Sequence, residues 1–275
     1  MARHRGKFDP FNTNPYELSR SAVESFIKCK ACFWLDKIVG IKPPEIPAFT
    51  LNTTTDILLK RDADSVRGTK SLPLWETNNL GHLIPFEHEH LENWTISLQF
   101  GANETYFNFD HELSGIRFGG GLDDVFQNQK TGQLHIVDYK STAQGTRSPL
   151  KYEKKPISLD DPWKAGYKRQ MDMYVWIMRQ KGFDVSDVGY FVYVDAQHKD
   201  IEGMLIDENP SRAWMQFDAS IIAYKADTGW VEPTLLEIRE FLNTQEVCPE
   251  HTAGKSIDGG CDVGRYANEV KRLLS

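Results

Sequence analysis

Two short β-like runs joined by a polar turn each carry an acid, in the stretch GGGLDDVFQNQKTGQLHIVDYKST at residues 119–142. If the hairpin turns about Lys130 and Thr131, Asp123 lies directly opposite Asp138 on one face of the sheet. Directly opposed side chains have Cβ atoms roughly 5 Å apart, and like charges in that position destabilise a sheet. The fold must therefore supply a compensating positive charge at this point.

Strand periodicity suggests how that charge is supplied. Side chains alternate between the two faces of a strand, so Lys140 shares the face of Asp138 while Tyr139 points to the other face. A divalent cation between the two carboxylates would offset their repulsion, and hard oxygen ligands suit Mg²⁺ or Mn²⁺ better than Zn²⁺. Two alternatives remain: the acids form a solvated face, or the register shifts by one residue and Asp124 replaces Asp123.

The composition limits the partners and the compartment. The 275-residue chain has a formal net charge of −7 and a pI near 5.6, which argues against a general nucleic-acid coat protein, so any contact with nucleic acid would be local. The N-terminal sequence MARHRGKFDP has no apolar run behind it, so we expect a cytoplasmic protein with neither a secretory signal nor a membrane anchor. Four cysteines are too few for a disulfide scaffold, so we expect thiols or metal ligands.

The order of the expected elements indicates an α/β protein. Ser21 and Glu24 form a capping-box pattern, and the apolar residues that follow at helical spacing predict two short helices hinged near Cys29. Further helices are expected at residues 53–64, 161–182, 233–242 and 266–274, and strands at residues 106–142, 187–196 and 215–227. Strand, strand, helix, strand is the order of an α/β core.

Three short motifs, in this order, resemble those of the PD-(D/E)XK nuclease superfamily. They are Gly-x-Leu-Asp at residues 120–123, Ile-Val-Asp-Tyr-Lys at residues 136–140, and Gln-x-x-x-Tyr at residues 170–174 on the next helix. The chain is most similar to the RecB-like branch, which includes CRISPR-associated adaptation nucleases and uncharacterised bacterial proteins. Residues 18–37 also resemble the N-terminal helical segment of that branch, so the resemblance covers most of the chain.

The resemblance implies a restriction-endonuclease-like core, in which a mixed central β-sheet is flanked by helices, with helical N- and C-terminal extensions. We expect a single nuclease-like domain over residues 1–275. Within it, residues 1–48 would form the N-terminal helical segment and residues 49–206 the catalytic core. Residues 207–275 would form a C-terminal strand and helices that carry candidate metal-binding cysteines.

The activity that the resemblance implies is hydrolysis of DNA phosphodiester bonds with one or two Mg²⁺ or Mn²⁺ ions. Asp123 and Asp138 would be the metal ligands, helped by the backbone carbonyl of Tyr139. Lys140 would orient or activate the attacking water and offset the charge that develops on the phosphate.

Further site residues would come from two helices. Gln170 and Tyr174 would flank the site and position the DNA backbone or the catalytic lysine. RecB-like enzymes commonly place a histidine on an early helix as an additional metal ligand, and the corresponding stretch LNTTTDILLK offers Asp56 instead. Asp56 can ligate a hard cation, although it can equally be a helix-surface acid, and His88 and His90 are alternative substitutes.

A locally basic stretch is the candidate nucleic-acid interface. Residues 140–169 contain eight basic and three acidic residues, a local charge of +5 in an acidic chain. A phosphate backbone could lie there, and Trp163 and Tyr167 could stack on splayed bases, unless the stretch is a solvated loop anchored by its aromatic residues. The candidate nucleic-acid-binding residues are Lys151, Lys154, Lys155, Trp163, Lys164, Tyr167, Lys168 and Arg169.

The cysteines suggest a second, structural metal site. Many RecB-like nucleases hold an iron–sulfur cluster with one early and three late cysteines, whereas this chain has two of each, Cys29, Cys32, Cys248 and Cys261. A zinc site that uses Cys29, Cys32 and Cys261 with either Cys248 or His251 is a rival. Unligated thiols packed among helices are the third interpretation.

These inferences favour a metal-dependent DNA nuclease, more narrowly an exonuclease in repair, recombination or spacer processing. Its substrate would be single- or double-stranded DNA, and a protein partner in a repair or processing complex could supply specificity. One alternative is a catalytically decayed DNA-binding module of the same fold, which the missing histidine favours. The other is an unrelated α/β protein, which would lack salt-dependent affinity for DNA.

Overall fold

A mixed five-stranded sheet forms the centre of the protein. The computed structural model describes residues 7–42, 49–144, 156–198, 201–205 and 208–274. Within the sheet β6 and β7 are parallel and the other neighbours are antiparallel. In spatial order the strands are β2 (Leu83–Pro85), β5 (Asp124–Asn128), β6 (Leu134–Thr142), β7 (Val188–Ala196) and β8 (Phe217–Lys225).

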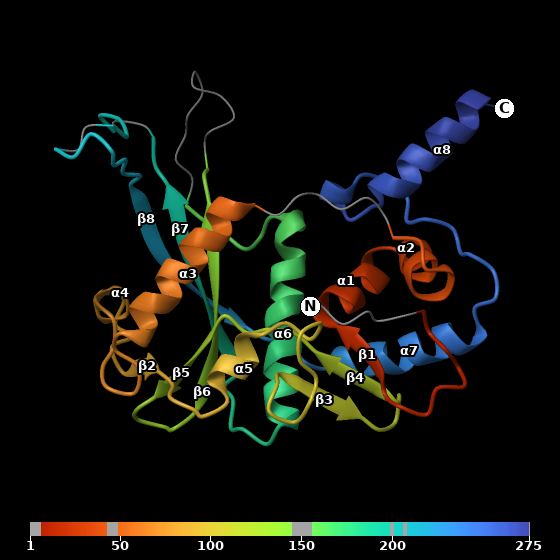
Figure 1. The fold of residues 1–275 in the computed structure, drawn as a ribbon, viewed down its shortest axis with the longest axis horizontal. Helices are drawn as coiled ribbons and strands as arrows, with labels where there is room; N and C mark the ends of the chain where they lie inside the picture. The colour runs from red at the N-terminus through yellow and green to blue at the C-terminus, as the bar shows by residue number, and fades with distance from the viewer. Residues whose placement is uncertain (1–6, 43–48, 145–155, 199–200, 206–207, 275) are drawn as a thin grey trace.

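Helices cover both faces of this sheet, as the sequence predicted for an α/β core. Helix α6 (Ala165–Gln180) connects the parallel strands β6 and β7 and packs on one face, while α3 (Thr50–Asp64) and α4 (Pro73–Thr77) lie on the other (Figure 1). The apolar side chains of the strands follow the period of two: Val125 and Ile136 join the core under α6, whereas Phe126 and Val137 join the core under α3. The predicted mixed sheet with flanking helices is confirmed.

A second, three-stranded sheet lies on the far side of α6 (Figure 1). Its strands are β1 (Tyr16–Ser19), β4 (Ile116–Gly119) and β3 (Asn108–His111), in that spatial order. Strand β1 pairs in parallel with β4, so its partner comes from a distant part of the chain. The sequence predicted only helices in this N-terminal segment, because a four-residue strand is too short to show a period.

Helix α1 begins earlier in the sequence than the capping-box pattern predicted. Ser19, not Ser21, caps α1 (Arg20–Lys28), and its hydroxyl accepts a hydrogen bond from the Ala22 amide at 3.3 Å. Glu24 does not complete a capping box, because it forms an ion pair with Arg169 instead. The expected hinge at Cys29 is confirmed, since this residue is extended between α1 and α2.

The remaining elements complete the chain. The segment after β8 contains α7 (Val231–Thr244), which packs in the same core as α1 and α6. Among the described residues, no helix has the length and hydropathy that crossing a membrane requires. The short and terminal elements are α2 (Lys30–Trp34), the π-helical turn η1 (Leu35–Val39), α5 (Leu91–Thr95), the 3-10 turns η2 (Pro162–Lys164) and η3 (Ser256–Asp258), and α8 (Asp262–Leu274).

The β5–β6 hairpin has the predicted register. Asp124 lies opposite Val137 and Val125 lies opposite Ile136, so Asp123, the residue before β5, is aligned with Asp138. The slipped register, in which Asp124 would replace Asp123, is wrong. The sequence expectation that Asp123 and Asp138 share one face follows from this pairing.

Asp124 points to the opposite face and is held there by its own partners. Both of its carboxylate oxygens accept hydrogen bonds from the Arg67 guanidinium, at 2.9 and 3.1 Å, and the Tyr139 hydroxyl donates a third at 3.0 Å. Burial raises the pKa of the Asp124 carboxyl even though Arg67 opposes the shift. Asp124 and Arg67 therefore form a buried ion pair that supports the sheet.

We expect Arg67→Met to lower the free energy of unfolding by about 3–5 kcal/mol, because it leaves the Asp124 carboxylate buried without an opposite charge. Adding Asp124→Asn to Arg67→Met should recover part of that loss, since the amide removes the unpaired charge. Urea denaturation followed by circular dichroism measures both values. A loss below about 1 kcal/mol in the single variant would contradict the structural role of this pair.

Candidate active site

A cleft of about 570 Å³ lies where the end of β6 meets α3 and α6. The motif residues Asp123, Lys140, Gln170 and Tyr174 line it, and the Asp138 carboxylate lies just beneath. Further polar lining residues come from around the start of α1, from α3, and from the end of α5 and the segment after it, and include Ser19, Arg20, Ser21, Asn52, Thr53, Asp56, Thr95, Ser97 and Gln99. Segments far apart in the sequence thus build one polar cleft.

Asp138 is the most buried acid of the cleft. One of its oxygens accepts a hydrogen bond from the Gln170 side-chain amide at 2.7 Å, and the other contacts the Lys140 ammonium. Burial raises the pKa of Asp138 to about 7, with Asp123 adding to the shift and Lys140 opposing it. The buried Asp138 carboxylate therefore needs more positive charge nearby than Lys140 alone supplies.

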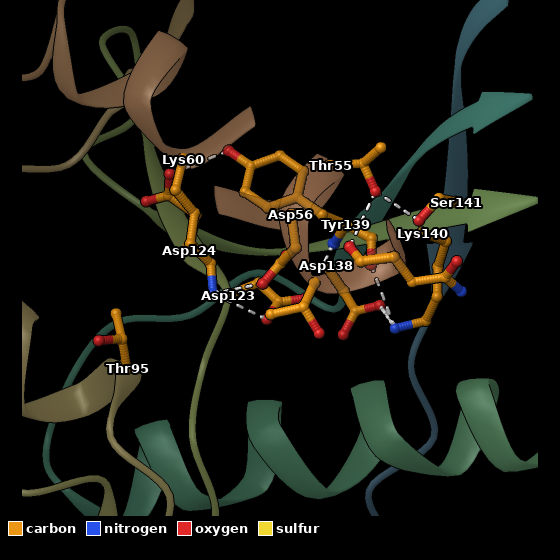
Figure 2. A network of polar contacts seen from close by, with 12 residues as sticks. Thr55, Asp56, Lys60, Thr95, Asp123, Asp124, Asp138, Tyr139, Lys140 and Ser141 are labelled. Atoms are coloured by element: carbon orange, nitrogen blue, oxygen red, sulfur yellow. Dashed lines mark hydrogen bonds and ion pairs between the residues drawn. The ribbon is translucent and has the colours of Figure 1, made fainter. Parts of the chain in front are cut away.

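Asp123 reaches the same point from the neighbouring strand. One oxygen accepts a hydrogen bond from the Tyr139 amide at 3.0 Å, and the other lies 3.3 Å from the Lys60 ammonium. Figure 2 shows the side chains of Asp56, Asp123, Asp138 and Lys140 converging above α6. The convergence that strand alternation predicted for Asp123, Asp138 and Lys140 is present.

The glycines before Asp123 allow this close approach. A Cβ at Gly120 would lie 2.8 Å from the Tyr174 ring, and one at Gly121 would lie 2.9 Å from the Thr95 carbonyl oxygen. A side chain at either position would push the strand away from α6 or α5. The glycines therefore serve packing beside the acids.

A model of the PD-(D/E)XK nuclease superfamily matches residues 59–260, which include the hairpin acids, Lys140 and α6. The chain belongs to the PD-(D/E)XK nuclease superfamily. A search of the curated proteins finds no match to the chain. The matching family is the superfamily as a whole, so similarity to the RecB-like branch stays a prediction.

In this nuclease fold, Asp56 belongs to the cleft and is not a solvated helix acid. Its α3 position brings one oxygen within 3.1 Å of the Lys60 ammonium, while its other oxygen is buried with no hydrogen-bond partner among the described residues. Burial and the neighbouring Asp123 raise the pKa of Asp56, against the effect of Lys60. His88 and His90 are absent from the cleft lining, and His88 stacks on Trp94.

The donor set suits a hard divalent cation. Asp56, Asp123 and Asp138 bring three carboxylates to one cleft, and the Tyr139 carbonyl faces the same side, since the Lys140 ammonium lies 3.4 Å from it. These are oxygen ligands, the type that Mg²⁺ and Mn²⁺ prefer. The unpartnered Asp56 oxygen and the raised pKa of Asp138 both indicate that the acids lack sufficient positive charge.

Two contributors escaped sequence reasoning. Arg20, at the start of α1, lines the cleft, and its positive charge acts to lower the pKa of the Tyr174 hydroxyl, which burial raises. Lys60 contacts both Asp56 and Asp123. The i, i+4 spacing of Asp56 and Lys60 is a sequence signal for their mutual contact, but nothing local in the sequence places Arg20 beside Tyr174.

The basic stretch divides into parts with different surroundings. Tyr167 lines the cleft beneath the Lys140 ammonium, which lies 4.9 Å from the centroid of its ring. Trp163, 47% exposed, and Arg169 line an adjoining cleft of about 1050 Å³. The expected binding role of Trp163, Tyr167, Lys168 and Arg169 stays a prediction, and Lys151, Lys154 and Lys155 lie outside the described residues.

Lys164 does not fit the expected nucleic-acid contact. Its side chain is 1% exposed, and its ammonium lies 3.0 Å from Asp161 and donates to the Ser158 carbonyl. A buried ammonium with these partners is not accessible to a phosphate backbone. The prediction for Lys164 is therefore wrong, because position 164 ends a 3-10 turn that directs the side chain into the protein.

The cysteines form a Cys₃His cluster away from the acids. Sulfur atoms of Cys29, Cys32 and Cys261 and a ring nitrogen of His251 all lie within 4.8 Å of one another. Cys248 is exposed and outside the cluster, so the set with Cys248 as the fourth ligand is corrected in favour of the His251 alternative. Although burial opposes it, hydrogen bonds from the Cys32 and Thr252 backbone, His251 and Cys261 lower the pKa of Cys29 to about 6. This ligand set is compatible with zinc or an iron–sulfur cluster.

We expect Mn²⁺ to raise the melting temperature of the protein, with a stabilisation of about 2.7 kcal/mol at one hundred times the dissociation constant. Asp123→Asn and Asp138→Asn should lose this rise, because each removes a charged ligand. Asp124→Asn is the matched control, since its carboxylate lies on the other face of the sheet and the rise should persist. Differential scanning calorimetry with and without added Mn²⁺, in the absence of chelator so that the cysteine cluster stays loaded, measures all four proteins.

Proposed function

We propose that the protein is a metal-dependent DNA nuclease that hydrolyses phosphodiester bonds, acting as an exonuclease in repair, recombination or processing. The convergence of Asp123, Asp138, Lys140 and Gln170 in one cleft carries this proposal. Membership of the superfamily supports a nuclease. Single- or double-stranded DNA is the proposed substrate, with protein partners in a repair or processing complex.

The proposed metal ligands are the carboxylates of Asp123, Asp138 and Asp56 and the backbone carbonyl of Tyr139. A bound Mg²⁺ or Mn²⁺ would lower the pKa of a coordinated water and polarise the phosphate. The protein prepares the site by burying Asp138 and by fixing Asp123 through the Tyr139 amide. Both restraints reduce the motion that the ligands would lose on binding.

Lys140 is the proposed catalytic lysine. Burial acts to lower the pKa of Lys140, but the combined effect of Asp138 and Asp123 is larger and raises it, so the side chain stays protonated. An ammonium in this position orients the attacking water through a hydrogen bond and offsets the negative charge of the phosphate. The Lys140 ammonium also lies 4.9 Å from the centre of the Tyr167 ring, a cation–π contact that helps to hold it in place.

Gln170 and Tyr174 are proposed to position these groups from α6. Gln170 fixes the orientation of Asp138 by donating to one oxygen, which leaves the other oxygen directed toward Lys140. Tyr174 fills the space under Gly120 and lies within the electrostatic influence of Arg20. One helix therefore sets both the acid and the strand that precedes Asp123.

We also propose that the Cys₃His cluster holds a structural zinc ion. Three thiols and one imidazole are a common ligand set for structural zinc, and an iron–sulfur cluster is the alternative. The cluster joins the α1–α2 hinge to the segment before α8, far along the chain. Metal binding there would stabilise the fold without taking part in hydrolysis.

Cleavage of end-labelled single- and double-stranded DNA with Mg²⁺ or Mn²⁺, against EDTA, tests the nuclease proposal. Asp138→Ala should abolish cutting while DNA binding persists, and Lys140→Ala should lower turnover by about 10²–10³-fold, because it removes one stabilising charge from the site. Asp62→Ala and Lys130→Ala, which alter exposed residues away from the cleft, should cut like the unmodified protein.

The outcomes separate the two functional classes. Cutting by Asp138→Ala at the unmodified rate would contradict the site assignment. If the unmodified protein binds DNA in a salt-dependent manner but cuts neither substrate, it is the decayed binding module.

For the cluster, we expect the purified protein to contain about one equivalent of zinc per chain by elemental analysis, since four ligands complete one tetrahedral site. Cys32→Ser and His251→Ala should lose this metal and melt at a lower temperature. Cys248→Ser is the matched control and should keep both. Iron and labile sulfide in place of zinc would contradict the zinc proposal, and full metal retention in Cys32→Ser would contradict the site.

A further inference from the structure

Lys60 is not among the residues that line the cleft, but its ammonium joins two acids that are. Its ammonium lies 3.1 Å from one Asp56 oxygen and 3.3 Å from one Asp123 oxygen, so it bridges an acid of α3 and an acid of the hairpin (Figure 2). The side chain is 25% exposed. None of the three superfamily-like motifs, at residues 120–123, 136–140 and 170–174, includes Lys60.

The positive charges of the cleft are divided between its acids. Lys140 contacts Asp138, and Lys60 contacts Asp56 and Asp123, so each lysine serves a different part of the acidic group. The three acids carry three negative charges when ionised, and the two lysines return two. About one further positive charge at Asp123 and Asp138 would therefore balance the acids, whereas two divalent ions would bring four.

The geometry holds Lys60 in this place before any ion arrives. Asp56 and Lys60 are one helical turn apart on α3, which aligns them on one face. The ammonium is held on two sides, because carboxylate oxygens of Asp56 and Asp123 lie 3.1 and 3.3 Å from it. A second divalent ion between Asp56 and Asp123 would have to displace this ammonium and overcome its repulsion.

We infer that Lys60 takes the place of a second divalent ion, so that the centre binds a single ion and the Lys60 ammonium supplies the other positive charge to the scissile phosphate. This inference rests on the proposed metal-dependent function. The single ion is bound by Asp123, Asp138, the Tyr139 carbonyl and the unpartnered Asp56 oxygen, while the other Asp56 oxygen keeps Lys60 in position. Lys60 is thereby a catalytic residue that contacts the phosphate, and Asp56 is its positioning residue.

The test is the number of Mn²⁺ ions bound per chain in the absence of DNA, measured by isothermal titration calorimetry and by electron paramagnetic resonance. The unmodified protein should bind one ion in the cleft. Lys60→Met should bind two, because Asp56 and Asp123 are then free to hold a second ion, and its first ion should bind about tenfold more tightly or better because a repelling charge is removed. All proteins are compared with the cysteine cluster loaded.

Two further variants keep the result interpretable. Lys60→Arg retains the charge and should still bind one ion, and Lys60→Gln, which can hydrogen-bond to both acids without a charge, should bind two if Lys60→Met does not fold. A spectrum of coupled Mn²⁺ pairs in Lys60→Gln or Lys60→Met, absent from Lys60→Arg, is the expected signature.

The outcomes distinguish this inference from the proposed function. Two ions in the unmodified protein, or one ion with unchanged affinity in both neutral variants, would overturn the role of Lys60 and leave the nuclease proposal standing. No ion in the cleft of the unmodified protein would overturn the metal-dependent function itself.

Discussion

The carboxylates of Asp123 and Asp138 meet on adjacent strands, an arrangement that costs free energy unless cations offset it. Much of the surrounding structure is arranged around this cost. Lys140 follows Asp138 on the same face, Lys60 arrives from α3, and Gln170 donates to Asp138 from α6. Each of these contacts adds positive charge or a hydrogen bond to the one that the Tyr139 amide of β6 donates to Asp123.

The hairpin separates two aspartates that are neighbours in sequence into different physical roles. Asp124 turns to the α3 side, where Arg67 and Tyr139 satisfy it completely and make it part of the support of the sheet. Asp123 turns to the cleft, where its partners are a backbone amide and an ammonium. In this chain the period of two therefore places an acid that supports the sheet beside an acid that faces the cleft.

The Cys₃His cluster has a different relation to the site. It joins the hinge after α1 to the segment before α8, and α1 begins at Arg20, which reaches Tyr174 in the cleft. A metal in the cluster would fix the far end of the helix whose first residue contributes to the cleft. The proposed metal would thus support the site through α1 without contacting the acids.

Local patterns in the sequence were sufficient for much of this protein. The turn at Lys130 and Thr131 determined the hairpin register, the period of two placed Asp138 and Lys140 together, and apolar spacing revealed α6. These features depend on residues close in the chain, so the sequence carries them directly.

Only the tertiary structure decided the features that depend on distant segments. It brought β1 beside β4, Arg20 to Tyr174, Lys60 to Asp123, and His251 rather than Cys248 to the other cysteines, and it buried Lys164. No local period encodes such pairings, because the free energy that selects them comes from packing and charge compensation between elements that meet only once the chain has folded.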